Sequence, residues 1–251
     1  DYNCDGKMDV FNSHLGGVRV FENISSSELV FTLQTNQLLS DRQADLVNPI
    51  YINIFVNGSD IPAIDDIDSD GDLDLLYLST IGNRIEYHKN LSIERYGNCD
   101  SLDFQLKNKC WGYIKELPNQ NMVTFNDTCS NNINNPEKQI GGDKHIGGSS
   151  MFTLDVDSNG TKDLVLGGNS YEILLLLINS DVTSGYTASS ILAQNNDFPQ
   201  AYSNTIAVDL EHFPAGYYLD VNNDGIKDLI SATNALTLSK NRSNVWCYLN
   251  G

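Results

Sequence analysis

Basic residues are scarce in this chain of 251 residues, which has 15 lysines and arginines against 33 aspartates and glutamates. The formal net charge of −18 argues against nucleic acid as a partner, because neutralising phosphates requires clustered lysine and arginine. It argues equally against an anionic lipid surface. Long hydrophobic runs are lacking too, since the longest, Ile173 to Ile178, is far too short to cross a bilayer. This run predicts a buried strand, and we expect no membrane insertion.

Catalytic motifs are also missing from the sequence. It contains no G-x-S-x-G elbow, no H-E-x-x-H, no G-x-G-x-x-G and no P-loop. The four histidines fall at unrelated positions and are interpreted as surface or packing residues: His14, His88, His145 and His212. We therefore predict no catalytic residue, and the chain is not expected to be an enzyme.

The five cysteines form no C-x-x-C pair, which argues against a zinc site and a thioredoxin-type motif. Cys99 and Cys110 flank a polar segment and would suit a local disulfide in an exported protein. The alternative is five free, partly buried thiols. The pairing of Cys4, Cys129 and Cys247 stays open at this point.

Four copies of one acidic pattern are present instead. Each copy has the form D-x-[DN]-x-[DN]-G-x-x-D, and the copies occupy residues 1–9, 66–74, 155–163 and 220–228. At positions 1, 3, 5 and 9 they use thirteen of the 33 acidic residues, in tight clusters. Carboxylates this close repel one another and are hard to keep ionised without a cation. Such placement is more than a general acid excess for solubility.

The sequence after each acidic loop repeats as well. A short apolar run follows directly, then a turn, then a second run that ends in asparagine at Asn23, Asn90, Asn179 and Asn250. Short apolar and aromatic runs split by turn residues are typical of β-hairpins. The spacing leaves room for further strands in each unit, so the pattern predicts an all-β fold of four-stranded antiparallel blades. We interpret residues 1–251 as one β-propeller region.

The middle interval between loops is longer than the other two. The extra residues, at about 97–142, are interpreted as an insertion on one blade, in the form of a surface loop. A binding protrusion and a passive elaboration are both open interpretations.

The repeated loop has the donor types that calcium prefers. Calcium takes six to eight oxygen ligands, and side chains at positions 1, 3, 5 and 9 with the position-7 carbonyl supply most of them. Glycine at position 6 permits the sharp turn. The predicted ligands are Asp1, Asn3, Asp5, Lys7 and Asp9; Asp66, Asp68, Asp70, Asp72 and Asp74; Asp155, Asp157, Asn159, Thr161 and Asp163; Asp220, Asn222, Asp224, Ile226 and Asp228. Up to four Ca²⁺ ions are therefore expected, with the second loop binding tightest because it has the most carboxylates.

Two other interpretations of the loops were weighed. Metal-free acidic turns closed by Asx hydrogen bonds are possible for one copy, but four matching copies argue against them. An EF-hand needs a bidentate glutamate at position 12, where this chain has Asn12, Tyr77, Leu166 and Ser231. The residues after each loop also predict strands and not helices. The EF-hand is therefore excluded.

With these residues the chain resembles the FG-GAP/VCBS repeat family, whose calcium loops recur in integrin α-chain propellers. The sequence matches the family pattern most clearly over residues 63–75 and 218–230. The hairpin ends at 20–23 and 246–250 resemble those of the family as well. The resemblance implies an exported bacterial protein, extracellular or at the cell surface, with a propeller of about seven blades. This chain supplies about four, so we expect the remaining blades or domains in the same longer protein.

The resemblance is specific for fold and metal and much less so for function. It implies a calcium-stabilised adhesion or interaction module that binds a protein or a glycan. Two alternatives are a propeller of a polysaccharide lyase-like enzyme and a purely structural stalk. A lyase would need a base and a charge-neutralising Arg or Lys gathered on one face, and the 15 basic residues are scattered.

Overall fold

The computed structural model describes residues 1–43, 48–79, 83–117, 120–127, 148–180, 189–200, 205–235, 237, 239–240 and 242–250. The described chain is 44% strand and 2% helix, which confirms the predicted all-β class. The helix α1 (Ser92–Tyr96) ends at Gly97, whose φ of 72° is left-handed. Among the described residues no helix has the length and hydropathy that a membrane span requires.

The first two sheets are built from the N-terminal half. The first is an antiparallel meander of β1 (Val10–His14), β2 (Gly17–Asn23) and β3 (Phe31–Thr35). The second has six strands in the order β5-β4-β9-β8-β7-β6, and in it only β4 and β9 run parallel. Its strands are β4 (Leu39–Asp41), β5 (Tyr51–Asn53), β6 (Ala63–Asp65), β7 (Asp74–Leu78), β8 (Ile85–Asn90) and β9 (Phe104–Asn108).

The C-terminal half supplies two further sheets, and a short hairpin precedes them in the chain. The third sheet contains β12 (Ser149–Leu154), β13 (Asp163–Gly168), β14 (Leu174–Asn179) and β15 (Ile191–Phe198). The fourth contains β16 (Pro214–Leu219), β17 (Asp228–Thr233) and β18 (Val245–Tyr248). A separate hairpin joins β10 (Lys115–Glu116) to β11 (Val123–Thr124). The prediction was four strands in each sheet. Among the sheets of the described residues, only the third has four.

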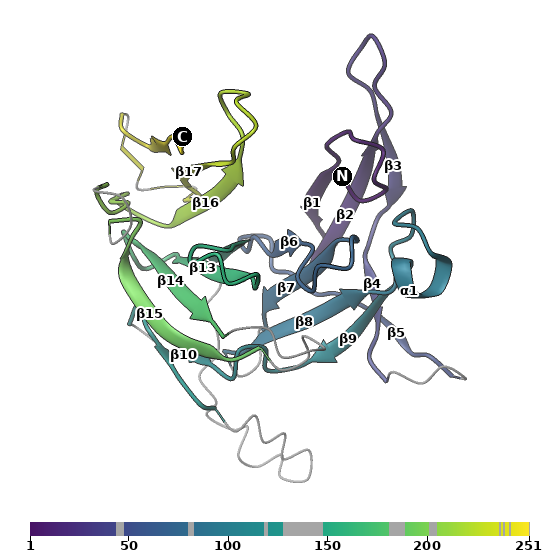
Figure 1. Cartoon of the computed structure of the whole chain (residues 1–251), viewed down its shortest axis with the longest axis horizontal. Helices are drawn as coiled ribbons and strands as arrows, with labels where there is room; N and C mark the ends of the chain where they lie inside the picture. The colour runs from purple at the N-terminus through teal and green to yellow at the C-terminus, as the bar shows by residue number, and fades with distance from the viewer. Residues whose placement is uncertain are drawn as a thin grey trace.

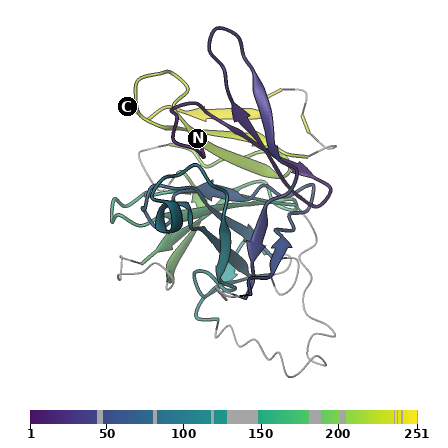
Figure 2. The same cartoon turned by 90° about the vertical axis from the view of Figure 1, so that its right-hand side faces the viewer.

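The four larger sheets follow one another round an arc (Figure 1). The first and fourth sheets form its two ends, and both views place them above the second and third (Figure 2). The edge strands β6, β12 and β16 of successive sheets are neighbours inside the arc. Ile61, just before β6, pairs with Ser150 of β12, and the Ser150 hydroxyl donates to the carbonyl oxygen of Pro214 in β16 at 2.9 Å. At this crossing a Cβ on Gly167 would lie 1.8 Å from the Pro214 oxygen, so only glycine fits.

The third sheet is buried on both faces. Alternate residues of β13 and β14 point to opposite sides, as in any strand. Leu164 and Leu177 are paired across the two strands and pack in the core shared with the second sheet. Their neighbours Val165 and Leu176 pack in a second core against the fourth sheet. Burial on both faces explains the continuous apolar run at 173–178 and confirms that it is a buried strand, each leucine contributing roughly 1.5–3 kcal/mol.

The segment at about 97–142 is not the surface loop that its length suggested, as far as it is described. Residues 118–119 and 128–142 lie outside the described residues. The remainder includes β9, which pairs with β8 inside the second sheet. Phe104 and Trp111 of this segment are at most 1% exposed and belong to the larger core. The segment therefore completes a sheet and fills the core.

The prediction of a disulfide between Cys99 and Cys110 is wrong. Cys99 is joined to Cys4, with 6.0 Å between their Cα atoms, and a sulfur forms only one such bond. Cys110 is disulfide-bonded as well, Cys247 is free, and Cys129 lies outside the described residues. The reason is local: β9 lies between Cys99 and Cys110, and its five extended residues span about 17 Å. A disulfide tolerates at most about 7 Å between Cα atoms.

Candidate metal centres

The four acidic loops occupy equivalent places in the four sheets. Three of them connect a strand at one edge of a sheet to the strand next to it: 66–74 joins β6 to β7, 155–163 joins β12 to β13, and 220–228 joins β16 to β17. The loop at 1–9 leads directly into β1. We call them loops 1 to 4 in chain order.

All four loops have the same backbone conformation at two unusual positions. Positions 4 and 6 have left-handed φ angles, of 57–62° at Cys4, Ser69, Ser158 and Asn223, and of 85–105° at Gly6, Gly71, Gly160 and Gly225. A Cβ added at any of these glycines would find no atom within 4 Å. Glycine is therefore required by the backbone conformation and not by crowding, as the sequence pattern predicted.

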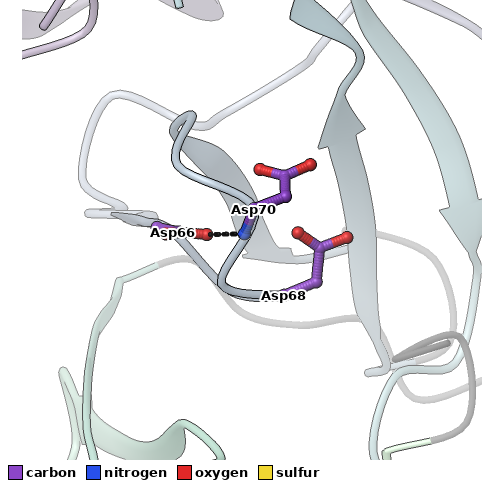
Figure 3. A group of neighbouring side chains, drawn as sticks. All are labelled: Asp66, Asp68 and Asp70. Atoms are coloured by element: carbon purple, nitrogen blue, oxygen red, sulfur yellow. Dashed lines mark hydrogen bonds between the residues drawn. The ribbon is translucent and has the colours of Figure 1, made fainter. Parts of the chain in front are cut away.

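The carboxylate at position 1 organises each loop through backbone amides. In loop 2 the two oxygens of Asp66 accept the N–H groups of Asp70 and Gly71, both at 3.1 Å. The corresponding pairs of hydrogen bonds form at Asp1, Asp155 and Asp220. In all four loops the position-5 side chain accepts the N–H of position 7. In loop 2 this shape brings the side chains of Asp66, Asp68 and Asp70 close together (Figure 3).

The carboxylate at position 9 ties each loop to the hairpin that follows it. The side chains of Asp9, Asp74, Asp163 and Asp228 are fully buried. In every loop one oxygen accepts the N–H of position 2 and the other accepts the N–H of the asparagine that ends the second run, at 2.8–3.1 Å. The backbone N–H makes this contact, so it does not itself require asparagine. At loops 1 and 3 the asparagine side chain adds a hydrogen bond to the position-8 carbonyl, of Met8 and Lys162, at 3.1 Å.

Burial makes two of these carboxylates unfavourable to ionise. It raises the pKa of Asp74 to about 8 and that of Asp163 to about 6. At Asp228 the N–H groups of Asn250 and Val221 instead lower the pKa. A buried acid with a raised pKa needs either a proton or a nearby cation, and a bound divalent ion would favour the charged form.

The predicted ligands converge most closely in loops 2 and 3. One carboxylate oxygen each of Asp66, Asp68 and Asp70 lies within 4.8 Å of the others, and Asp155, Asp157 and Asp163 form a similar group. Loops 1 and 4, which are fully described, have asparagine at position 3 and form no group of three carboxylates. The position-7 ligand is the carbonyl oxygen of Lys7, Asp72, Thr161 or Ile226, and its coordination stays a prediction.

Loop 2 supplies the test of whether a cation fits. Oδ1 of Asp68 is buried and accepts no hydrogen bond from the described residues. The ammonium group of Lys89 stands among the same side chains, 2.8 Å from Oδ2 of Asp70 and in contact with Asp68 and Glu94. Burial lowers the pKa of Lys89, but its hydrogen bonds to these acids outweigh that and raise it. A positive charge is therefore accommodated here, and the oxygen donor set suits Ca²⁺.

Sequence reasoning missed Lys89 and Glu94. Lys89 directly precedes Asn90, the asparagine that holds Asp74, so the hairpin brings it onto loop 2. The corresponding residues at the other loops are Glu22, Ile178 and Leu249. The recurring asparagine was the available signal, because the residue before it lies beside the loop at loops 1 and 2.

A second polar cluster is buried in the second sheet, away from the loops. Nδ1 of His88 lies 2.7 Å from the hydroxyl of Ser40, and its Nε2 lies 3.3 Å from Glu86. Glu86 also accepts from Arg42 at 2.6 Å and from Tyr77 at 2.9 Å. Burial opposes the charge of Glu86, but these partners hold its pKa down at about 2. His88 is 0% exposed and Ser40 is 1% exposed, so this cluster joins β4 to β8 in the interior.

Comparison with models of known protein families gave no match, and a search of curated protein sequences found none. The resemblance to FG-GAP/VCBS repeats therefore rests on the residues of the loops and hairpins themselves. The geometry that unites them is the shared backbone, the shared amide contacts and the buried aspartate at position 9.

Proposed function

We propose that loops 1 to 4 bind calcium and that the chain is a calcium-stabilised region of an exported protein of the FG-GAP/VCBS type. The observation that carries this proposal is the fourfold recurrence of one loop geometry, down to the same left-handed positions and the same amide contacts at Asp74, Asp163 and their counterparts. Because the four loops share one geometry, we expect each of them to bind the same kind of ion.

The role proposed for the ion is structural. Three or four oxygen donors in each loop carry negative charge, and an ion that binds only the folded loop adds its binding free energy to stability. Because the position-9 carboxylate also holds the end of the next hairpin, an ion at the loop would connect the edge strand of a sheet to the two strands next to it. Calcium is abundant outside cells, so even sites with dissociation constants of about 10⁻⁴–10⁻³ M would be filled there.

The propeller is part of the proposal. Its support is the succession of sheets round an arc (Figure 1), with β6, β12 and β16 as neighbouring edge strands and an acidic loop after each of them. We infer blades of a propeller that other blades of the same longer protein complete, about seven in all. A location outside the cell is supported by the Cys4–Cys99 disulfide, since such bonds persist in oxidising compartments.

The activity that fits best is adhesion or interaction: a rigid scaffold that presents loops to a protein or a glycan. A lyase-like enzyme and a structural stalk are the alternatives. The cluster of Ser40, His88 and Glu86 has the residue types of a hydrolytic triad, but a substrate could not reach a hydroxyl that is 1% exposed. It therefore does not favour the enzyme.

Thermal unfolding with and without calcium tests the metal part of the proposal. We expect 5 mM chelator to lower the melting temperature by several degrees or more, because several sites are lost together. Asp70→Ala should remove part of the calcium-dependent gain, whereas Glu28→Ala, at an exposed acid outside the loops, should not. An unchanged melting curve in chelator would contradict the proposal. Glycan arrays and unsaturated products from acidic polysaccharides then separate binding module, stalk and lyase.

A further inference from the structure

Loop 2 differs from its three counterparts in having a lysine, Lys89, at the residue before the asparagine. Loop 1 also has an ammonium group beside a predicted ligand, but it belongs to Lys7 of the loop itself, 3.1 Å from Oδ2 of Asp5. Nζ of Lys89 lies 2.8 Å from Oδ2 of Asp70 and contacts Asp68, both of them predicted calcium ligands. Glu22 takes the same place beside loop 1, where it accepts a hydrogen bond from the side chain of Asn3 at 3.2 Å. At loops 3 and 4 the residues before the asparagine, Ile178 and Leu249, are uncharged. Only loop 2 therefore meets a competing positive charge at the residue before the asparagine.

A second acidic cluster, which shares Asp70 with the first, lies beside the same lysine. Oxygens of Asp70, Asp72 and Glu94 lie within 4.8 Å of one another. Asp72 is 1% exposed, and its Oδ1 accepts no hydrogen bond from the described residues while its Oδ2 accepts the N–H of Ile93 at 3.0 Å. Glu94, whose side chain is 40% exposed, already contacts Lys89. A buried oxygen without a partner is costly unless a donor or cation reaches it.

We propose that Lys89 competes with calcium at loop 2 and moves to Asp72 and Glu94 when the ion binds. This inference rests on the proposed calcium function and goes beyond it, because it assigns a different affinity to one loop. Loop 2 has the most carboxylates, but its charge is already partly neutralised. It is then a weaker calcium site than loop 3, the reverse of the order that carboxylate counting gives.

The lysine also stabilises the shape of loop 2 when no metal is bound. With the ammonium group in place, the repulsion between Asp68 and Asp70 is relieved, so the loop keeps its shape at low calcium. The exchange of one cation for another makes binding at this loop respond to a higher calcium concentration than binding at loop 3.

The test reads each loop separately. The position-6 glycine N–H groups each donate to the position-1 carboxylate, so the amide signals of Gly6, Gly71, Gly160 and Gly225 report the four loops in a nitrogen–proton correlation spectrum. Calcium chloride is titrated into the metal-free chain. We expect Gly71 to respond at a higher calcium concentration than Gly160.

Lys89→Met removes the charge and keeps an apolar side chain. It should shift the Gly71 midpoint to a calcium concentration lower by about tenfold or more, and leave the Gly160 midpoint unchanged. Lys227→Met is the matched control, since Lys227 lies beside loop 4 with its ammonium over the ring of Tyr218 and not among the ligands. Lys89→Arg keeps the positive charge, so Gly71 should still respond only at the higher calcium concentration. This variant shows whether the effect of Lys89→Met comes from the charge and not from altered packing.

Glu94→Gln tests where the lysine goes. It should weaken loop 2 several-fold in the natural chain and have little effect in the Lys89→Met background. An equal weakening in both backgrounds would mean simple attraction between Glu94 and calcium, and would overturn the proposed movement.

The outcomes separate this inference from the proposed function. If Gly6, Gly160 and Gly225 respond to calcium while Lys89→Met leaves Gly71 unchanged, the competition is wrong and the calcium function stands. If none of the four glycines responds up to 10 mM calcium, the calcium function is wrong and the competition is wrong with it.

Discussion

The aspartate at position 9 should stabilise the fold even without calcium, and Asp163→Ala tests this in loop 3. The side chain is fully buried and accepts the N–H groups of Val156 at 2.9 Å and Asn179 at 2.8 Å. Truncation to alanine leaves both amides without their acceptor. Each unsatisfied buried group costs about 1–3 kcal/mol, so the loss is roughly 2–6 kcal/mol.

Part of that loss is offset. The burial that raises the pKa of Asp163 to about 6 shows that its charge is unfavourable in the folded protein, and alanine removes that charge. At pH 7.5 we therefore expect the lower part of the range, about 2–3 kcal/mol. For a chain of this size that is a fall in melting temperature of roughly 4–12 °C.

The measurement is thermal unfolding by circular dichroism in 5 mM chelator. Asp157→Ala is the matched control, because Asp157 is an exposed predicted ligand of the same loop. It should weaken calcium binding but change the melting temperature in chelator by little. Asp163→Asn should fall between the two, since its amide oxygen still accepts one N–H. Equal melting temperatures for Asp163→Ala and the natural chain in chelator would refute the structural role of position 9.

Three further predictions concern pH, oxidation and backbone conformation. In chelator, the folded pKa of Asp74 of about 8 lies above its unfolded value near 4, so its contribution to stability is lost as pH rises toward 8. The free energy of unfolding from urea titrations at pH 6 and pH 8 should therefore fall more steeply with pH in the natural chain than in Asp74→Asn, and equal slopes would count against the raised pKa. Cys99→Ser opens a disulfide with a sequence separation of 95 and should cost roughly 4 kcal/mol by the same titration, whereas Cys247→Ser, at the free cysteine, should cost little. Gly71→Ala should lose about 1–2 kcal/mol in chelator from its φ of 105° alone, despite open space around the Cβ, and a neutral result would contradict the strained backbone.

Much of the loop geometry could be predicted from the sequence, because short-range patterns determine it. The glycine at position 6, the acidic side chains and the asparagine that ends the second run all lie within 30 residues of one another. The buried strand at 173–178 was equally predictable, since an unbroken apolar run fits a sheet covered on both faces.

What the sequence did not reveal depends on contacts between distant segments. Cys4 meets Cys99 only because loop 1 and the end of α1 come together in the folded chain. Trp111 and β9 fill the core from a segment whose extra length resembled a surface insertion. Lys89 was overlooked because its charge matters only where the hairpin folds back onto loop 2. In each case the role of the residue depends on which distant segment it meets in the folded chain, and its type alone does not reveal that.

The most direct test of the central claim is the calcium content of the purified chain, measured by elemental analysis after dialysis against 2 mM calcium and brief removal of unbound ion. We predict three to four calcium ions per chain, none after chelator, and one fewer in Asp155→Ala, which removes the organising carboxylate of loop 3. A chain that retains no calcium while it remains folded would contradict the assignment of all four loops.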